Sequence, residues 1–340
     1  MGFYINVEPD VKIYVEDLNP ESCNTILFLH GWPASHRMFE YQFDQLPKLG
    51  YRCIGIDQRG FGNSDKPWTG YDYDTLADDI RCVVEALNLQ NFVLAGHSTG
   101  GAIAVRYMAR HKEYGVAKLA LFAAAAPSVI QRPYFPHGLT REAVIKIIQD
   151  TYNDRPEMLR GFGNMFFFQH VTQSFSDWFF QMGLQAAGWS TAAIAKSWLN
   201  EESLFNNLRE IHVPTLILHG IQDKICLFPL AIAQNEEIRN SKLVSFKYSG
   251  HGLFYDEQNK VQNPVIRNIV DSKIPSLVHT RVFSDMPAMA LISTTKEHWL
   301  IFSLCFFKCL IPPRVPLYWI VGMFVQIMNH IGLSGQYYFV

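Results

Sequence analysis

A buried-strand candidate at residues 91–97 ends in the motif Gly-His-Ser-Thr-Gly, and a segment with an apolar helical face follows over residues 99–110. The Gly-x-Ser-x-Gly pattern alone is weak evidence, but a strand that turns sharply into a helix is the setting that displays a serine as a nucleophile. Gly96 and Gly100 leave room for the strand and the helix to approach each other. The first amides of the helix point to where negative charge would develop on a substrate. We therefore interpret Ser98 as a candidate nucleophile.

Apolar strands and amphipathic helices alternate around this motif. The run at residues 25–29 reads as an apolar strand covered on both faces, and further strands are expected at residues 51–56, 118–124, 214–218 and 243–248. Two short strands at residues 2–7 and 11–16 predict an antiparallel edge, and helical segments lie at residues 36–49 and 73–87. The alternation predicts an α/β fold with a mostly parallel central sheet and helices on both faces.

The same pattern divides the chain into a core and an insertion. Residues 1–127 and 210–262 carry the alternation and are expected to form one core. Residues 128–209 show helices and no strand, which predicts an inserted helical cap. The expected cap helices cover residues 141–152, 156–169, 174–184 and 191–199.

The cap is rich in aromatic side chains, more than helices on a solvated exterior need. We expect most of them to pack inside the cap and a minority to line an apolar substrate pocket facing Ser98. The pocket candidates are Trp32, Pro33, Phe162, Phe166 and Trp178.

Residues 263–340 form an atypical apolar C-terminal extension. Its apolar runs at residues 299–311 and 317–328 are shorter than the roughly 20 residues that span a bilayer, and Lys308 interrupts the first. We favour a surface-lying or re-entrant hairpin, or a poorly packed extension, over a spanning anchor. Membrane association through this extension is the less favoured alternative.

Composition limits the class of partner. The chain has 340 residues, is 49% hydrophobic and carries a formal net charge of −2, so it can bury a large core and offers no electrostatic reason to bind nucleic acid. Asp74, Asp78 and Asp79 are interpreted as solvated charges that favour the N-terminal half of their helix. The six cysteines lack metal-ligand spacing, and reduced, buried thiols are expected. The N-terminus shows no secretion signal, so a cytoplasmic enzyme is expected. Separately, we expect no metal and no cofactor.

A serine nucleophile needs a base and an orienting acid. His251 directly follows the last predicted strand and lies between glycines, so it should reach the same sheet edge as Ser98. Asp223 lies four residues beyond another strand end, and the order Ser98, Asp223, His251 suits a catalytic triad. Asp57 is the competing acid, but it sits in a glycine-rich turn before Ser98, so we interpret it as a loop cap.

Two backbone amides are expected to stabilise a developing oxyanion. One is the N–H of Thr99, directly after the nucleophile, and the other is the N–H of Trp32, in the loop after residues 25–29. Pro33 restricts the backbone of Trp32 and orients this loop.

These stretches resemble the α/β-hydrolase superfamily, especially its small bacterial aryl esterases and cofactor-free haloperoxidases, also called perhydrolases. The resemblance covers residues 1 to about 260. Its matching stretches are His30-Gly-Trp-Pro33, Asp57-Gln-Arg-Gly-Phe-Gly-Asn-Ser64, Gly96-His-Ser-Thr-Gly-Gly101, His219-Gly-Ile-Gln-Asp223 and Gly250-His251-Gly252. The extension departs from that family, whose members end in a helix soon after the catalytic histidine.

The resemblance implies hydrolysis of small apolar carboxylic esters through a serine acyl-enzyme. A Trp-Pro pair after His-Gly, here Trp32 and Pro33, is associated in that branch with hydrogen peroxide replacing water. Lactonase or amidase activity and a non-catalytic ligand-binding role remain alternatives at this point, and the natural substrate and oligomeric state stay open.

Overall fold

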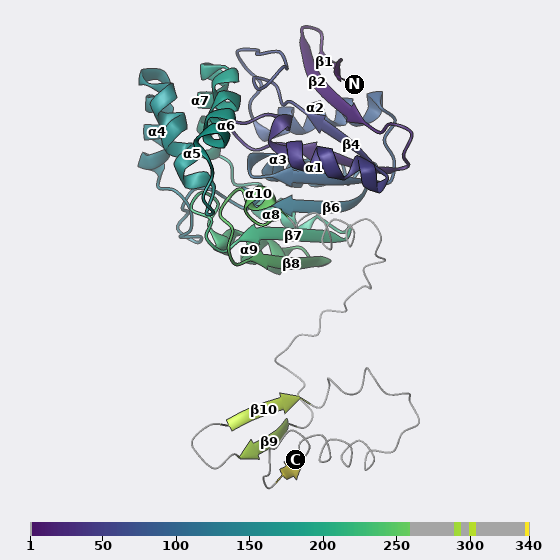
Figure 1. Cartoon of the computed structure of the whole chain (residues 1–340), viewed down its shortest axis with the longest axis vertical. Coiled ribbons are helices and arrows are strands. Elements are labelled where there is room, and N and C mark those ends of the chain that lie inside the picture. The colour runs from purple at the N-terminus through teal and green to yellow at the C-terminus, as the bar shows by residue number, and fades with distance from the viewer. Residues whose placement is uncertain (1, 259–288, 294–298, 304–336, 340) are drawn as a thin grey trace. The chain divides into compact units, whose positions relative to one another are not determined.

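The computed structural model describes residues 2–258, 289–293, 299–303 and 337–339. Its main element is an eight-stranded sheet with the order β1-β2-β4-β3-β5-β6-β7-β8 (Figure 1). The strands are β1 Gly2–Glu8, β2 Val11–Leu18, β3 Asn24–Leu29, β4 Tyr51–Ile56, β5 Phe92–His97, β6 Val116–Phe122, β7 Thr215–Gly220 and β8 Ser241–Phe246. Strand β2 runs antiparallel to β1 and β4, and all other neighbours are parallel. The predicted α/β fold and its antiparallel edge are confirmed.

The central strands bury side chains on both faces of the sheet. In β3, Leu27 and Leu29 join the core cluster beneath α2 Tyr73–Ala86 and α3 Thr99–Arg110, whereas Ile26 and Phe28 join the cluster on the opposite face. Successive side chains of a strand point to opposite faces, so both sets must be apolar. Helices α8 Leu204–Arg209 and α9 Phe228–Glu237 extend the first layer, and α10 Leu253–Asp256 belongs to the second.

The helix expected over residues 36–49 is divided into three short pieces. The structure has 3₁₀ turns at η1 His36–Phe39 and η2 Pro47–Leu49, with α1 Glu40–Gln45 between them. Proline lacks an N–H, so Pro47 cannot extend the hydrogen bonds of α1, and the chain continues as the separate 3₁₀ turn η2.

Four helices, α4 Arg141–Asn153, α5 Arg155–Phe166, α6 Gln173–Gln185 and α7 Gly188–Trp198, form a helical insertion beside the sheet (Figure 1). Helix α4 packs against α7, and α5 against α6. The expected helix 156–169 ends earlier, because the amides of Phe168 and Gln169 donate to the carboxylate of Asp256 at 3.0 Å. Asp256 also accepts from the amide of Gly250 at 2.8 Å, which fastens the insertion to the His251 loop.

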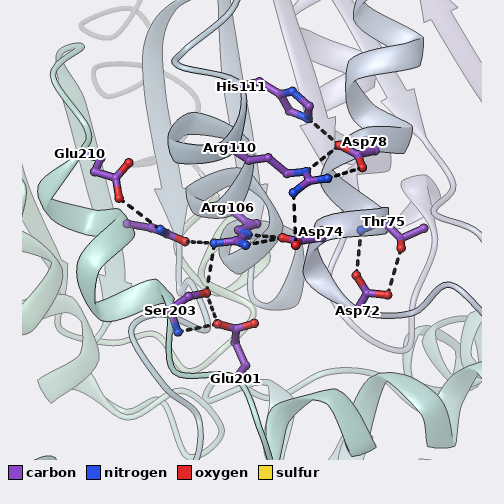
Figure 2. A network of polar contacts seen from close by, with 11 residues as sticks. Asp72, Asp74, Thr75, Asp78, Arg106, Arg110, His111, Glu201, Ser203 and Glu210 are labelled. Carbon is purple, nitrogen blue, oxygen red and sulfur yellow. Dashed lines mark hydrogen bonds and ion pairs between the residues drawn. The ribbon is translucent and has the colours of Figure 1, made fainter.

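An ionic network links α2 to α3 and to the chain that returns from the insertion (Figure 2). Arg106 of α3 contacts Asp74 of α2 and hydrogen-bonds Asn207 of α8 at 2.9 Å. Arg110 donates to both carboxylate oxygens of Asp78, at 2.7 and 2.8 Å. The side chains of Asp74 and Asp78 stay 43% and 45% exposed, as expected of solvated charges, and they also pair with cations of the neighbouring helix.

Asp79 departs from the prediction of a solvated charge, because it is buried. Its two oxygens accept hydrogen bonds from Arg59 at 2.6 Å, and a buried carboxylate requires such a partner. The described cysteines are unpaired, and two of them, Cys53 and Cys226, are buried as expected. Cys23 is exposed and Cys82 half-buried, which corrects the expectation for these two.

The chain beyond residue 277 belongs to a second compact unit, residues 278–340. Its described residues form a three-stranded antiparallel sheet with the order β10-β9-β11, made of β9 Met289–Ser293, β10 Trp299–Ser303 and β11 Tyr337–Phe339. Strand β10 covers the start of the first apolar run, and the rest of both runs lies outside the described residues. Within the described part of the chain, every helix is too short or too polar to cross a bilayer.

Candidate active site

Ser98 occupies a sharp turn between β5 and α3. Its φ of +52° and ψ of −122° lie outside the regions that side chains favour, and such a conformation costs on the order of 1–3 kcal/mol. The strain is held by two backbone hydrogen bonds, from the Ser98 amide to Phe122 at 3.0 Å and from the Ala125 amide to the Ser98 carbonyl at 2.9 Å. The neighbouring strand β6 and its following loop therefore keep Ser98 at the turn.

Glycines on either side of Ser98 let the helix approach the sheet. A Cβ on Gly96 would lie 2.5 Å from the carbonyl oxygen of Gly100, and a Cβ on Gly100 would lie 2.4 Å from that of Leu29. Both contacts involve backbone, which cannot move aside cheaply. The turn therefore requires glycine at both positions, as the sequence predicts.

Asp223 and His251 meet at the carboxyl end of the sheet. His251 Nδ1 donates to Asp223 Oδ2 at 2.7 Å, and both side chains are fully buried. Asp223 Oδ1 accepts from the amides of Ile225 at 2.8 Å and Cys226 at 2.9 Å. A carboxylate with these donors orients the imidazole and leaves its other nitrogen free to accept a proton.

The environment of Asp223 keeps it ionised. Burial by itself raises the pKa of this carboxyl, but the charge of His251 and the hydrogen bonds from His219 and His251 outweigh burial, and the pKa lies below its usual range. The site thus holds a carboxylate rather than a carboxylic acid at neutral pH.

His97, which precedes Ser98 in the chain, contacts His251 directly. The ring of His97 lies 4.6 Å from the His251 ring, centroid to centroid, and His97 Nε2 donates to the His251 carbonyl at 3.0 Å. His251 Nε2 is buried and has no hydrogen-bond partner among the described residues, while the Ser98 side chain contacts the thiol of Cys226. Catalytic hydrogen bonds often tighten only when substrate binds, so the unpartnered His251 Nε2 is the candidate acceptor for the Ser98 proton.

Asp57, the competing acid, and the nearby His30 have other partners. Asp57 accepts from the His36 amide and ring, both at 2.8 Å, and from the Asn63 amide at 2.8 Å. Burial raises the pKa of Asp57, but the hydrogen bond and charge of His36 outweigh this and hold it below its usual range. His30 Nε2 accepts from the Gln58 amide at 3.0 Å. These contacts organise the loop after β4 and leave neither group at Ser98.

A predominantly apolar cavity of about 100 Å³ opens beside Ser98. Its walls are Trp32, Thr99, Ala125, Val129, Leu139, Ile147, Phe162, Met165, Trp198, Lys224, Ile225 and Cys226. A second cavity of about 520 Å³ shares Trp32, Ile147, Phe162 and Met165 with the first. The shared wall separates a small chamber at Ser98 from a larger outer one.

The five pocket candidates have different positions. Trp32 and Phe162 line the small chamber, with ring centroids 5.0 Å apart. Pro33 lines a separate small cavity, Phe166 packs edge-on against His251 at 4.9 Å, and Trp178 packs against Phe175.

Thr99 and Trp32, the residues expected to supply the oxyanion donors, both line this chamber. Thr99 is the first residue of α3, whose first amides have no partner within the helix, and Trp32 belongs to the facing loop. The Trp32 indole donates to the Thr191 carbonyl at 3.0 Å, which anchors the loop to the insertion. Within the described residues, no three His, Cys, Asp or Glu side chains gather as metal ligands.

The buried His97 predicts that the free energy of unfolding falls as the pH is lowered. Burial, reinforced by His251, holds the pKa of His97 well below its usual range, whereas an unfolded histidine binds its proton near pH 6.5. Between these values the unfolded state holds more protons. The stability is therefore present above about pH 6.5 and lost below it, with a slope of about 1.4 kcal/mol per pH unit.

Urea unfolding of wild type and His97→Gln between about pH 7 and pH 5 measures this slope. We expect His97→Gln to reduce the slope by about 1.4 kcal/mol per pH unit, which corresponds to the uptake of one proton fewer on unfolding. The control is His212→Gln, whose side chain is 79% exposed. An equal slope in wild type and His97→Gln would contradict the prediction.

The sheet, the turn at Ser98 and the inserted helices define the class of protein. The family model for the alpha/beta hydrolase fold matches residues 24–258, and the chain belongs to the α/β-hydrolase superfamily. Family membership makes a small molecule the expected kind of substrate. The relatives of this chain include esterases and cofactor-free, non-heme haloperoxidases, as the resemblance predicts.

The match with this chain covers nearly the whole length of each of three relatives. AB hydrolase superfamily protein YisY of Bacillus subtilis (strain 168) is 46% identical, over 77% of this chain and 97% of that protein. The bifunctional esterase/perhydrolase DCH of Acinetobacter calcoaceticus is 30% identical, over 77% of this chain and 98% of its own. The solved esterase EaEST from Exiguobacterium antarcticum is 43% identical with a TM-score of 0.77, covering 80% of this chain and 100% of that chain.

The residues that sequence reasoning missed lie mainly in the chamber wall. Cys226 contacts Ser98, and Val129, Leu139 and Ile225 line the chamber. Cys226 follows Asp223 by three residues, so its position after a strand end was a usable signal. The other three carry no sequence signal beyond being apolar.

Proposed function

We propose that this chain is a serine esterase that cleaves small carboxylic esters through an acyl-enzyme. The observation that carries the proposal is the strained turn that displays Ser98 to an apolar chamber beside the His251–Asp223 pair. The 43% identity to a solved esterase supports the same reaction class.

In the first half-reaction, Ser98 Oγ attacks the ester carbonyl carbon while His251 Nε2 takes the hydroxyl proton. The amides of Trp32 and Thr99 donate to the oxyanion. The intermediate collapses with cleavage of the bond to the alkoxy oxygen, and His251 returns the proton to the leaving alcohol. Asp223 stays ionised and stabilises the transient imidazolium.

In the second half-reaction, water attacks the acyl carbon and loses its proton to His251. Cleavage of the bond to Ser98 Oγ releases the carboxylic acid, and the proton returns to Ser98.

Labelling with a fluorophosphonate probe tests the attack by Ser98, because the probe forms a covalent bond only with an activated serine. We expect one label per chain, at Ser98. Ligand binding without labelling would instead favour a non-catalytic binding protein.

The size of the small chamber predicts a preference for short acyl chains. A cavity of 150 Å³ in another protein holds one benzene molecule, so the roughly 100 Å³ here suits an acyl group of about four carbons or fewer. We expect kcat/KM for p-nitrophenyl esters to fall at least tenfold between butyrate and octanoate. Amides and lactones in the same panel test the alternative substrate classes.

A matched pair of variants on α4 tests whether the chamber sets this preference. Ile147 separates the small chamber from the outer cavity, whereas Ile145 is exposed on the same helix. Ile147→Ala should raise kcat/KM for octanoate relative to butyrate about tenfold, and Ile145→Ala should leave the ratio unchanged. The same ratio in both variants would place acyl selection elsewhere.

Perhydrolysis is a second candidate activity of the same acyl-enzyme. Hydrogen peroxide would replace water as the attacking group and release a peracid. The Trp32-Pro33 pair, of which Trp32 lines the chamber, and the 30% identity to an esterase/perhydrolase favour it. Peracid formation from acetate esters, followed by bromide oxidation, measures this activity, and its absence would restrict the enzyme to hydrolysis.

A further inference from the structure

His219 is a buried histidine that the proposed reaction steps do not use. It lies near the carboxyl end of β7, and its Nε2 is 2.6 Å from the Cys226 carbonyl oxygen and 3.4 Å from Asp223 Oδ2. Both neighbours are hydrogen-bond acceptors, so the proton of a neutral His219 belongs on Nε2. Its Nδ1 is buried without a hydrogen-bond partner among the described residues.

His219 contacts both Asp223 and Cys226, the two residues of the loop after β7 that reach the candidate site. Asp223 Oδ1 accepts a hydrogen bond from the Cys226 amide at 2.9 Å. His219 Nε2 donates to the carbonyl oxygen of the same residue. Cys226 is thus fastened at its amide by the acid and at its carbonyl by His219. Its thiol contacts Ser98, and Asp223 Oδ2 holds His251 at 2.7 Å.

The end of β7 packs closely against the backbone before His251. A Cβ on Gly220, next to His219, would lie 2.2 Å from the Gly250 carbonyl oxygen and 2.3 Å from that of Ser249. The end of β7 therefore presses against the segment that carries His251. A shift of residues 219–226 would move both the acid and the wall that contacts Ser98.

We propose that His219 is a positioning residue of the esterase reaction, which aligns Asp223 with His251 and Cys226 with Ser98 through a single N–H. This inference rests on the proposed function. Displacing reacting groups by about 1 Å costs on the order of 10²-fold in rate. A residue that only stabilised the fold would change the unfolding temperature and leave the turnover number of folded enzyme unaltered.

Three substitutions and one control test the proposal. His219→Phe keeps a ring but removes the donor, His219→Gln restores an N–H near the Nε2 position, and His219→Asn places its amide nearer the Nδ1 position. Thr215→Val removes a buried hydroxyl from the other end of the same strand. For each variant, kcat and KM for p-nitrophenyl acetate are measured per probe-titrated site, together with the rate of fluorophosphonate labelling and the thermal midpoint.

We expect His219→Phe to lower kcat and the labelling rate 10- to 100-fold with KM within about twofold. His219→Gln should recover at least tenfold of the loss, His219→Asn should stay slower than His219→Gln, and Thr215→Val should keep wild-type kcat. If His219→Phe does not fold, the difference in kcat and labelling rate between His219→Gln and His219→Asn tests the proposal. Wild-type kcat and labelling in His219→Phe, or equal rates in Gln and Asn, would overturn the proposal. Failure of the esterase assignment is distinct, because Ser98→Ala would then remain active.

Discussion

Ser98→Ala is expected to abolish ester hydrolysis, lowering kcat for p-nitrophenyl acetate on the order of 10⁶-fold. Without the hydroxyl no acyl-enzyme forms, and the oxyanion donors and the cavity can assist only direct attack by water. The residual rate should therefore stay on the order of 10³- to 10⁴-fold above the uncatalysed reaction. The fold should persist, because alanine leaves the backbone hydrogen bonds of residue 98 in place.

A buried serine outside the chamber provides the matched control. The Ser190 hydroxyl donates to the Gly60 and Ala187 carbonyls at 2.8 Å, so Ser190→Ala also removes a buried hydroxyl. It should lower the free energy of unfolding by about 1 kcal/mol and retain wild-type kcat. Near-wild-type hydrolysis or probe labelling in Ser98→Ala would refute the proposed mechanism.

Asp223→Asn is expected to lower kcat about 10⁴-fold with little change in KM. An asparagine can still accept from the Ile225 and Cys226 amides through its oxygen, so its NH₂ group would face His251 Nδ1. Two donors cannot share that contact. The imidazole would then carry its proton on Nε2, the tautomer that cannot take a proton from Ser98.

Asp57→Asn is the control for this prediction, because Asp57 is the competing acid and is equally buried. Its carboxylate serves His36 and Asn63, so the substitution should lower the free energy of unfolding and leave kcat per probe-titrated site within a few fold. Rates measured per titrated site separate loss of folded protein from loss of catalysis. A large fall in kcat for Asp57→Asn with none for Asp223→Asn would reverse the two assignments.

Much of the fold was readable because its signals are local. A strand covered on both faces must be apolar at every position, as in residues 26–29, and a strand that ends in Gly-His-Ser-Thr-Gly before a helix marks the turn at Ser98. The positions of Asp223 and His251 followed from the same logic, since parallel strands bring their carboxyl ends to one edge.

Other features depended on interactions that the local pattern does not contain. The helix expected over residues 156–169 ends at Phe166 because its continuation is bonded to Asp256, a residue far along the chain. Asp79 is buried with Arg59 although its sequence context is that of a solvated helix. Each case is a long-range polar partner that outweighs a local preference.

The amino-acid sequence by itself determined the α/β architecture, the strained turn at Ser98 and the strand ends that carry Asp223 and His251. Only the tertiary structure decided which aromatic side chains line the chamber and that Cys226 and His219 contact the candidate site. The physical reason is that strand burial and turn geometry depend on neighbouring residues, whereas a cavity depends on how separate helices face one another. The insertion is aromatic on many sides, so its composition does not specify which side faces Ser98.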